Sequence, residues 1–175
     1  MKQEEADLQA IAESVERGDD PYVVPAELLV EPELNAPVNK SLFAQILQMS
    51  VGERIKLALK GNRDARMILI RDTNRLIQRF VLQNPRLTED EVVTIARNRN
   101  LDVDLLRKIA ENKQWPRNYQ VRHALVTNPK TPLASALHFV GTMMERDLRL
   151  LAKSKNVSAT IAAQARRLLV QRQKS

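Results

Sequence analysis

The side chains that most often carry catalysis are sparse in this sequence. His123 and His138 are the only imidazoles, and neither lies in an HExxH or DxH spacing. The sequence has no cysteine, which excludes disulfides, thiolate metal sites and cysteine nucleophiles together. We therefore expect each histidine to pack at a helix boundary or on the surface rather than to bind a metal or transfer protons.

Other catalytic patterns are also missing. The acidic run Glu89-Asp90-Glu91 falls in the first turn of a predicted helix, where carboxylates complement the helix dipole. The four glycines form no GxGxxG or GxxxxGKS/T phosphate-binding loop, and no serine stands in a GxSxG context. The sequence thus predicts no active site, no cofactor and no bound metal, and we expect that the protein is not an enzyme.

The remaining chemistry lies in the basic side chains. The chain holds 28 Lys and Arg against 21 Asp and Glu, a formal net charge of +7. Residues 1–35 contain ten acids and two bases, a charge of −8, which leaves +15 for residues 36–175. A basic surface of this kind can bind a polyanion or an acidic protein segment. The alternative is a solvated helix exterior without a partner.

Basic residues recur at matching places along the chain. Arg86 and Lys130 follow Asn-Pro steps, whereas Arg99, Lys113 and Lys155 each lie three residues after an apolar-Ala pair. In a stacked repeat array, equivalent positions line up along one face. The predicted basic face comprises Arg66, Arg86, Arg99, Lys113, Arg122, Lys130, Lys153 and Lys155. Trp115, the only tryptophan, either anchors a partner or closes the gap between two repeats.

The elements that would position these residues follow an acidic segment. Apolar residues at helical spacing predict a short amphipathic helix over 5–17. Four of the eight prolines fall between 21 and 37, which predicts an extended linker. We place an acidic arm and linker at residues 1–38 and a helical repeat domain at residues 39–175. The opposite charges suggest that residues 1–35 contact the protein's own basic body or another chain.

Beyond the linker, nearly every segment has helical periodicity. Only 3% of the residues are aromatic, so core material is mainly Leu, Ile, Val and Ala, which suits helices better than a β-sandwich. Ser50 with Glu53 and Thr88 with Glu91 match the capping box, and Thr131 is placed to cap a helix that starts on a proline. These patterns predict an all-α protein of nine or ten short helices.

Internal similarity predicts how these helices are arranged. Residues 80–88 resemble residues 124–132 at a separation of 44. One helix hairpin cannot bury both of its faces, so neighbouring hairpins must stack to build a continuous core. A spacing in the forties lies in the range of HEAT and armadillo repeats. We therefore predict a right-handed α-solenoid of short helix pairs, preceded by the extended acidic N-terminal arm.

Two short steps carry a resemblance to known repeats. The Asn-Pro-x-Thr-Pro step at 128–132 and the Leu-Ala-x-x-x-Asn-Val-Ser step at 151–158 resemble bacterial leucine-rich-variant and HEAT-like α-helical repeats, over roughly residues 50–170. The run from Met49 to Ala58 also resembles the start of a family of uncharacterised bacterial proteins. The resemblance implies a helical repeat fold and no particular activity. Some leucine-rich-variant proteins carry a cysteine-ligated iron–sulfur module, for which this chain has no ligands.

These observations favour a non-catalytic interaction scaffold that presents a basic helical-repeat surface to a protein partner, which could be acidic. The alternative is a nucleic-acid-associated module that binds the phosphate backbone through rows of Arg and Lys. A repeat-fold DNA glycosylase is disfavoured because six aromatic residues are too few to wall a base pocket. No stretch approaches 18 apolar residues and the first residues are acidic, so we expect no membrane contact and a cytoplasmic location.

Overall fold

Polar side chains begin most of the helices. In the computed structural model, which describes residues 1–37 and 39–174, the Ser50 hydroxyl accepts a hydrogen bond from the Glu53 amide, and the Glu53 carboxylate accepts one from the Ser50 amide at 2.7 Å. Thr88 and Glu91 form the second reciprocal pair. Both predicted capping boxes are confirmed, and each satisfies two of the four amides that a helix start leaves free.

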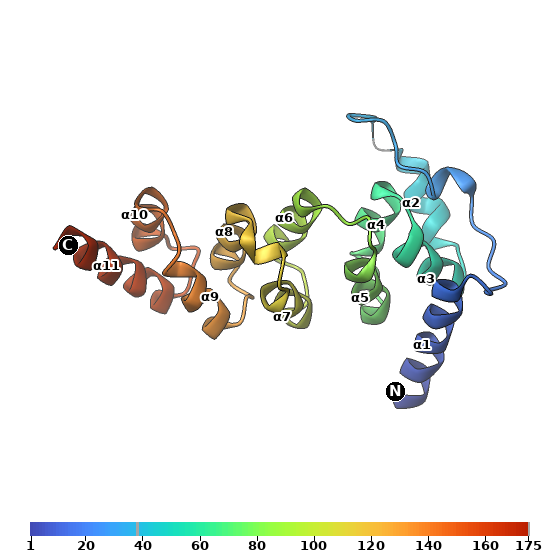
Figure 1. Ribbon diagram of the computed structural model, residues 1–175, viewed down its shortest axis with the longest axis horizontal. Helices are drawn as coiled ribbons and strands as arrows, with labels where there is room; N and C mark the ends of the chain where they lie inside the picture. The colour runs from blue at the N-terminus through green and yellow to red at the C-terminus, as the bar shows by residue number, and fades with distance from the viewer. Residues whose placement is uncertain (38, 175) are drawn as a thin grey trace. The chain divides into compact units, whose positions relative to one another are not determined.

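The described residues form eleven α-helices and two short 3-10 helices, with no strand among them, which confirms the all-α prediction (Figure 1). The α-helices are α1 (Lys2–Arg17), α2 (Lys40–Leu47), α3 (Val51–Lys60), α4 (Arg63–Leu69), α5 (Arg75–Gln83), α6 (Glu89–Arg97), α7 (Val103–Glu111), α8 (Tyr119–Thr127), α9 (Leu133–Val140), α10 (Glu145–Lys153) and α11 (Ala159–Gln173). The 3-10 helices are η1 (Ala26–Leu28) and η2 (Trp115–Arg117).

The predicted cap at Thr131 is wrong. The N-cap of α9 is Pro132, whose ψ of 130° is extended, so the first helical residue is Leu133. Thr131 is buried just before this start, and its hydroxyl makes no hydrogen bond to any residue that the structure describes. Proline at the N-cap supplies no side-chain acceptor, so the first amides of α9 lack the capping that the sequence suggested.

The chain divides into two compact units, Met1–Leu87 and Thr88–Ser175. Residues 1–37 of the predicted arm lie in the first unit, together with α2 to α5. The first unit contains 12 basic and 13 acidic residues, whereas the second contains 16 basic and 8 acidic residues. The second unit, with a formal charge of +8, therefore accounts for the basic excess of the protein.

In the first unit, α1 packs against α3 and buries Leu8, Ala12 and Val15 (Figure 1). Gly18 ends α1 in the left-handed conformation, with φ of 79°, which glycine adopts without a steric penalty. Residues 19–31 then run over α3 and α4, and we call this segment the strap. A Cβ at position 52 would stand 2.1 Å from the Tyr22 ring, so the strap approaches α3 closely only because residue 52 is glycine.

Polar side chains from the helices anchor the strap along its length. The Lys56 ammonium donates to the Asp20 carboxylate at 3.0 Å and to the Tyr22 carbonyl at 2.7 Å. The side-chain amide of Asn62 donates to the Glu27 and Val30 carbonyls at 3.0 and 2.9 Å. Because Asn62 is buried, its amide needs these strap carbonyls as partners. The strap is thus a bonded part of the first unit.

The second unit is built from three consecutive helix pairs, α6 with α7, α8 with α9 and α10 with α11. Its core consists mainly of Leu, Ile, Val and Ala side chains, as the low aromatic content predicts. Five-residue turns at 98–102, 128–132 and 154–158 join the helices within each pair.

Within residues 1–37 and 39–174, every helix is too short or too polar to span a lipid bilayer.

Candidate binding surface

The three turns of the second unit share one local structure. In each, a side-chain oxygen of the first residue accepts a hydrogen bond from the amide of the third residue. The acceptors are Asn98, Asn128 and Ser154, at distances of 2.9, 3.0 and 3.1 Å. Such bonds hold the turn backbone in a single conformation. Asn84 makes the same bond to the Arg86 amide in the first unit, at 3.0 Å.

A buried asparagine joins two of these turns. The side-chain amide of Asn128 donates to the Ala96 carbonyl at 2.7 Å and to the Asn98 carbonyl at 3.0 Å. The turn after α8 therefore lies beside the turn after α6. This contact brings Arg99 and Lys130 to the same edge of the second unit.

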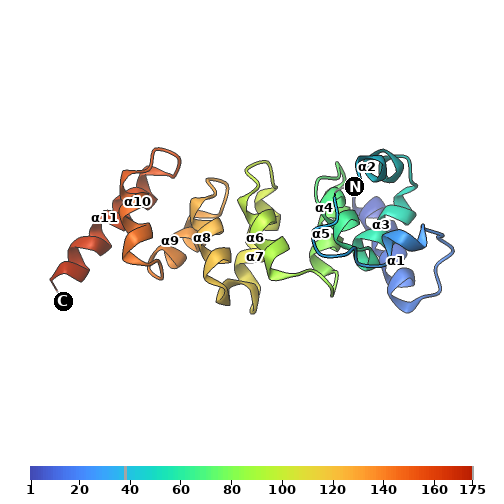
Figure 2. The same cartoon turned by 90° about the horizontal axis from the view of Figure 1, so that it is seen from above.

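The third turn lies along the same edge. The Tyr119 hydroxyl accepts a hydrogen bond from the Met144 amide at 3.0 Å and donates to Asp147, so α8 and α10 begin side by side. Both helices are nine residues long, and Figure 2 shows the turns that follow α6, α8 and α10 on one edge of the second unit. Lys153 and Lys155 stand at the last of these turns.

Four of the predicted residues thus lie along one edge of the second unit. We call Arg99, Lys130, Lys153 and Lys155 the basic edge. All four are exposed, and in the part of the chain that the structure describes none has a carboxylate partner. The ion pairs found in the second unit instead join Arg107 to Asp104, Arg146 to Asp147 and Arg149 to Glu145. The charges of the basic edge are therefore available to a ligand.

Lys113 and Arg122 do not belong to this edge. Lys113 lies in the connection between α7 and α8, at the opposite end of the helices. The Arg122 guanidinium donates to the Pro116 carbonyl at 2.8 Å and to the Thr142 hydroxyl at 3.0 Å, and it lies 5.4 Å from the centre of the Tyr119 ring. Arg122 therefore joins the connection between α7 and α8 to the connection between α9 and α10, at the edge opposite the basic edge.

Arg66 and Arg86 lie in the first unit and bond within it. Arg66 is only 1% exposed, so its place on an exposed basic face is wrong: its guanidinium pairs with Glu31 at 2.6 Å and donates to the Gly61 carbonyl at 2.9 Å. Arg86 is half-buried and donates to the Leu29 carbonyl at 2.9 Å and to the Lys60 carbonyl. Both arginines hold the strap.

The sequence contained a signal for the burial of Arg66. Asn62, Ala65, Arg66 and Leu69 follow the i, i+3, i+4, i+7 spacing of a buried helix face, and all four are buried. An arginine on such a face needs an acidic partner, and Glu31 supplies it. Composition alone does not distinguish this buried arginine from an exposed one.

Trp115 and the two histidines lie in or beside helices of the second unit. Trp115 is half-buried in η2, where its amide donates to the Asn112 side chain at 3.0 Å. His123 is half-buried on α8, and His138 is exposed with its ring 5.3 Å from the Phe139 ring. Among the described residues, no three His, Cys, Asp or Glu side chains cluster in a way that could hold a metal ion.

The pair of Tyr119 and Asp147 is the one that most resembles an acid–base site. Burial raises the pKa of the Tyr119 hydroxyl, and its hydrogen bond to Asp147 raises it further. The hydroxyl, however, accepts a hydrogen bond from the amide of Met144, the N-cap of α10, and this is the bond that Glu53 and Glu91 accept in the two capping boxes. The pair closes the first turn of α10, with Asp147 at the position that Glu53 and Glu91 occupy in the capping boxes.

Comparisons of this chain with protein-family models, with curated proteins and with solved structures find no match.

Proposed function

We propose that the protein is a non-catalytic binding module that presents the basic edge of its second unit to an acidic segment of a protein partner. The observation that carries this proposal is the position of Arg99, Lys130, Lys153 and Lys155 on three hydrogen-bonded turns, where all four are exposed and have no carboxylate partner among the residues that the structure describes. The formal charge of +8 on the second unit would steer an acidic partner toward it.

The fixed turns favour binding because their backbone is already ordered. A binding surface that is rigid before the encounter loses less conformational entropy when the partner arrives. Asn128 joins the turns that carry Arg99 and Lys130, so the two cations start from a fixed pair of backbone positions. Only the Lys and Arg side chains remain to be ordered on binding.

The spacing of the turns suits a polypeptide. Packed helices lie about 8–10 Å apart, and an extended chain rises ~3.3–3.6 Å per residue. An extended partner with an acidic residue at about every third position would therefore meet successive turns. A nucleic acid is the alternative partner. The basic edge contains no aromatic residue, so it offers no platform for stacked bases and could hold only a phosphate backbone.

We further propose that the helix pairs of the second unit are HEAT-like repeats of a right-handed α-solenoid. The support is the recurrence of one turn type and the contact through Asn128 between successive pairs. Equivalent basic positions then recur once per repeat, as a solenoid binding surface requires.

A charge-reversal experiment tests the proposed function. The test variant is Arg99→Glu with Lys130→Glu, and the matched control is Lys108→Glu with Arg117→Glu. The control removes the same charge from exposed residues that lie away from the basic edge. Fluorescence anisotropy would measure binding of labelled polyglutamate and of random-sequence duplex DNA to the full chain at several salt concentrations.

We expect the test variant to bind polyglutamate about tenfold more weakly than the wild type, and the control to lose clearly less. Exposed ion pairs contribute ~0.2–1 kcal/mol each, and reversal adds repulsion to the loss of two such pairs. Equal losses in the two variants would refute a specific role of the basic edge. Binding of duplex DNA alone, with a log–log salt slope of about −0.9 per phosphate contacted, would favour the nucleic-acid alternative.

A further inference from the structure

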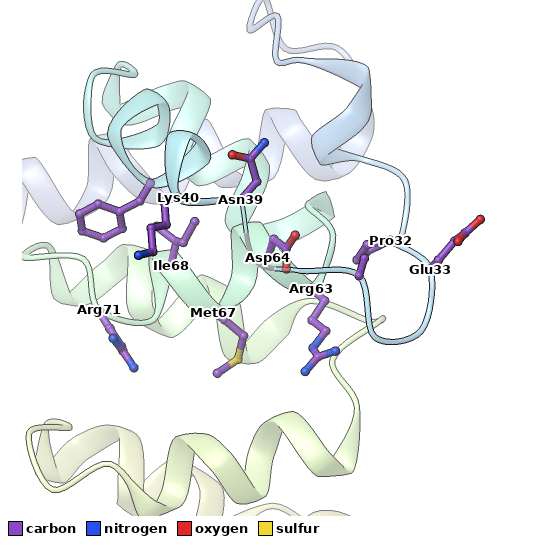
Figure 3. A pocket seen from close by; sticks show the side chains of 11 residues that line it. Pro32, Glu33, Asn39, Lys40, Arg63, Asp64, Met67, Ile68 and Arg71 are labelled. Atoms are coloured by element: carbon purple, nitrogen blue, oxygen red, sulfur yellow. The ribbon is translucent and has the colours of Figure 1, made fainter.

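The first unit contains a pocket of about 580 Å³ that the basic edge does not involve. The pocket lies between α4 on one side and residues 32–36 with the start of α2 on the other (Figure 3). Apolar side chains from both sides line it, chiefly Phe43, Met67 and Ile68. Phe43 remains 47% exposed and Leu47, one helical turn further along α2, remains 56% exposed. Phe43 and Leu47 thus extend the apolar lining of the pocket onto the surface of α2.

Basic side chains border this apolar surface. Arg63 and Arg71 stand four residues before and four residues after Met67; Arg63 begins α4, Arg71 lies in the turn that follows it, and Figure 3 shows the three side chains pointing the same way. Lys40 lies at the start of α2. The cations of Lys40, Arg63 and Arg71 are exposed, and within residues 1–37 and 39–174 none forms an ion pair.

Among the described residues, the two acids of the pocket, Glu33 and Asp64, form no ion pair with these three cations. Glu33 projects away from the other side chains in Figure 3. Asp64 lies in the first turn of α4, where its charge complements the helix dipole. A ligand that enters between α2 and α4 therefore meets an apolar surface with Arg63 on one side and Arg71 on the other.

We propose that this pocket binds a short acidic peptide segment of a partner protein. The segment inserts a large apolar side chain against Phe43 and Met67, and its flanking carboxylates pair with Arg63 and Arg71. The complementary charge pattern, with one apolar position between two cations, favours such a segment. Helix α1 of a second copy does not fit, because its apolar residues Leu8, Ala12 and Val15 are buried on α3. This proposal is independent of the proposed function, because the site lies in the other unit.

The test selects binders from a random short-peptide library displayed on phage, with the full chain as target. Selected peptides are then measured on two pocket variants, Met67→Glu and Arg71→Glu. Met67 is half-buried and Arg71 is exposed, so the second variant preserves the test if the first does not fold. The matched control is Leu150→Glu, which places the same acid on an exposed apolar residue of the second unit.

We expect the enriched peptides to share a large apolar residue flanked by Asp or Glu. Their affinity should fall about tenfold or more on each pocket variant, which is the range for losing one buried apolar contact or one charge pair and adding repulsion. The control and the Arg99→Glu, Lys130→Glu variant should bind them as the wild type does. The proposal is overturned if the library yields no binder, if the consensus lacks acids, or if the pocket variants bind with unchanged affinity. Loss on the basic-edge variant alone would assign the peptides to the proposed function instead.

Discussion

Asn128→Ala should destabilise the second unit more than any other single asparagine change within its turns. The Asn128 side chain is buried and makes three hydrogen bonds, to the carbonyls of Ala96 and Asn98 and from the amide of Lys130. Alanine would leave the buried Ala96 carbonyl without this donor near the end of α6, where helix carbonyls have no intrahelical partner, while the Asn98 carbonyl would keep its bond from the Leu101 amide at 3.2 Å. Each buried group left unsatisfied costs about 1–3 kcal/mol, whereas the exposed Lys130 amide can bond to water. We expect a loss of about 1–3 kcal/mol.

Urea denaturation followed by tryptophan fluorescence measures this loss selectively. Trp115 is the only tryptophan and belongs to the second unit, so its emission reports the unfolding of that unit. For an m value of about 1.5 kcal/mol/M, the midpoint should fall by roughly 1 M. The matched control is Asn98→Ala, because the Asn98 side chain accepts one bond in an exposed part of the turn. This control should lose about 0.5–1.5 kcal/mol.

The reasoning would be refuted if Asn128→Ala and Asn98→Ala lowered the midpoint equally. Such a result would mean that water replaces the Asn128 amide at both carbonyls. The contact between the two turns would then contribute nothing to stability, and the case for fixed positions in the basic edge would weaken with it.

Three further predictions concern the packing of single side chains. Burial opposes ionisation of Asp20, but the hydrogen bonds from the Lys56 side chain and the Tyr22 amide, together with the charges of Lys56 and Lys60, outweigh it and lower the pKa of Asp20 below its ordinary value of 3.8. This pair should therefore stabilise the fold fully above that value and progressively less as the pH falls below it. Thermal melting of the wild type and Asp20→Asn between pH about 2 and 7 would test this. The difference between their melting temperatures should shrink toward acid pH. Gly52→Ala should cost about 1–3 kcal/mol, because the new methyl group collides with the Tyr22 ring, and Tyr22→Ala should relieve part of that cost in a double-mutant cycle. Tyr119→Phe removes the hydroxyl that closes the start of α10 and should cost about 1–3 kcal/mol by urea denaturation; a cost near zero would show that water caps the helix equally well.

Local signals in the sequence predicted the helices well. Ser50 with Glu53 and Thr88 with Glu91 define a helix start within four residues, so no distant contact is needed to recognise it. The predicted number of helices was slightly low, because α2 is a short helix that buries only Leu42 and Ile46 and begins directly after the proline-bearing stretch. Thr131 was assigned as a cap because a proline at the first helical position is common, but here the proline itself occupies the N-cap.

The candidate surfaces could not be predicted from the sequence, because they depend on which residues far apart in the chain lie close together in space. The basic edge depends on which helix ends lie side by side, and Asn128 reaches a carbonyl 32 residues away. The spacing of Arg63, Met67 and Arg71 was visible in the sequence, but the apolar wall opposite them comes from Phe43 on another helix. The burial of Arg66 was equally hard to predict, because it depends on an ion pair with Glu31, which is 35 residues away in the sequence. Residue type alone does not show whether an arginine or lysine is exposed to a ligand or buried and bonded within the fold.

The anchoring of the strap has a consequence for biosynthesis. Residues 19–31 leave the ribosome before any of the side chains that hold them, since Lys56, Arg66 and Arg86 are translated later. At a synthesis rate of about 5–20 residues per second, roughly 3–13 s pass between the addition of Asp20 and the addition of Arg86 to the growing chain. During that interval the acidic residues 1–35 lack these basic partners, and the first unit can complete its folding only when α5 and Arg86 pack against the residues made before them.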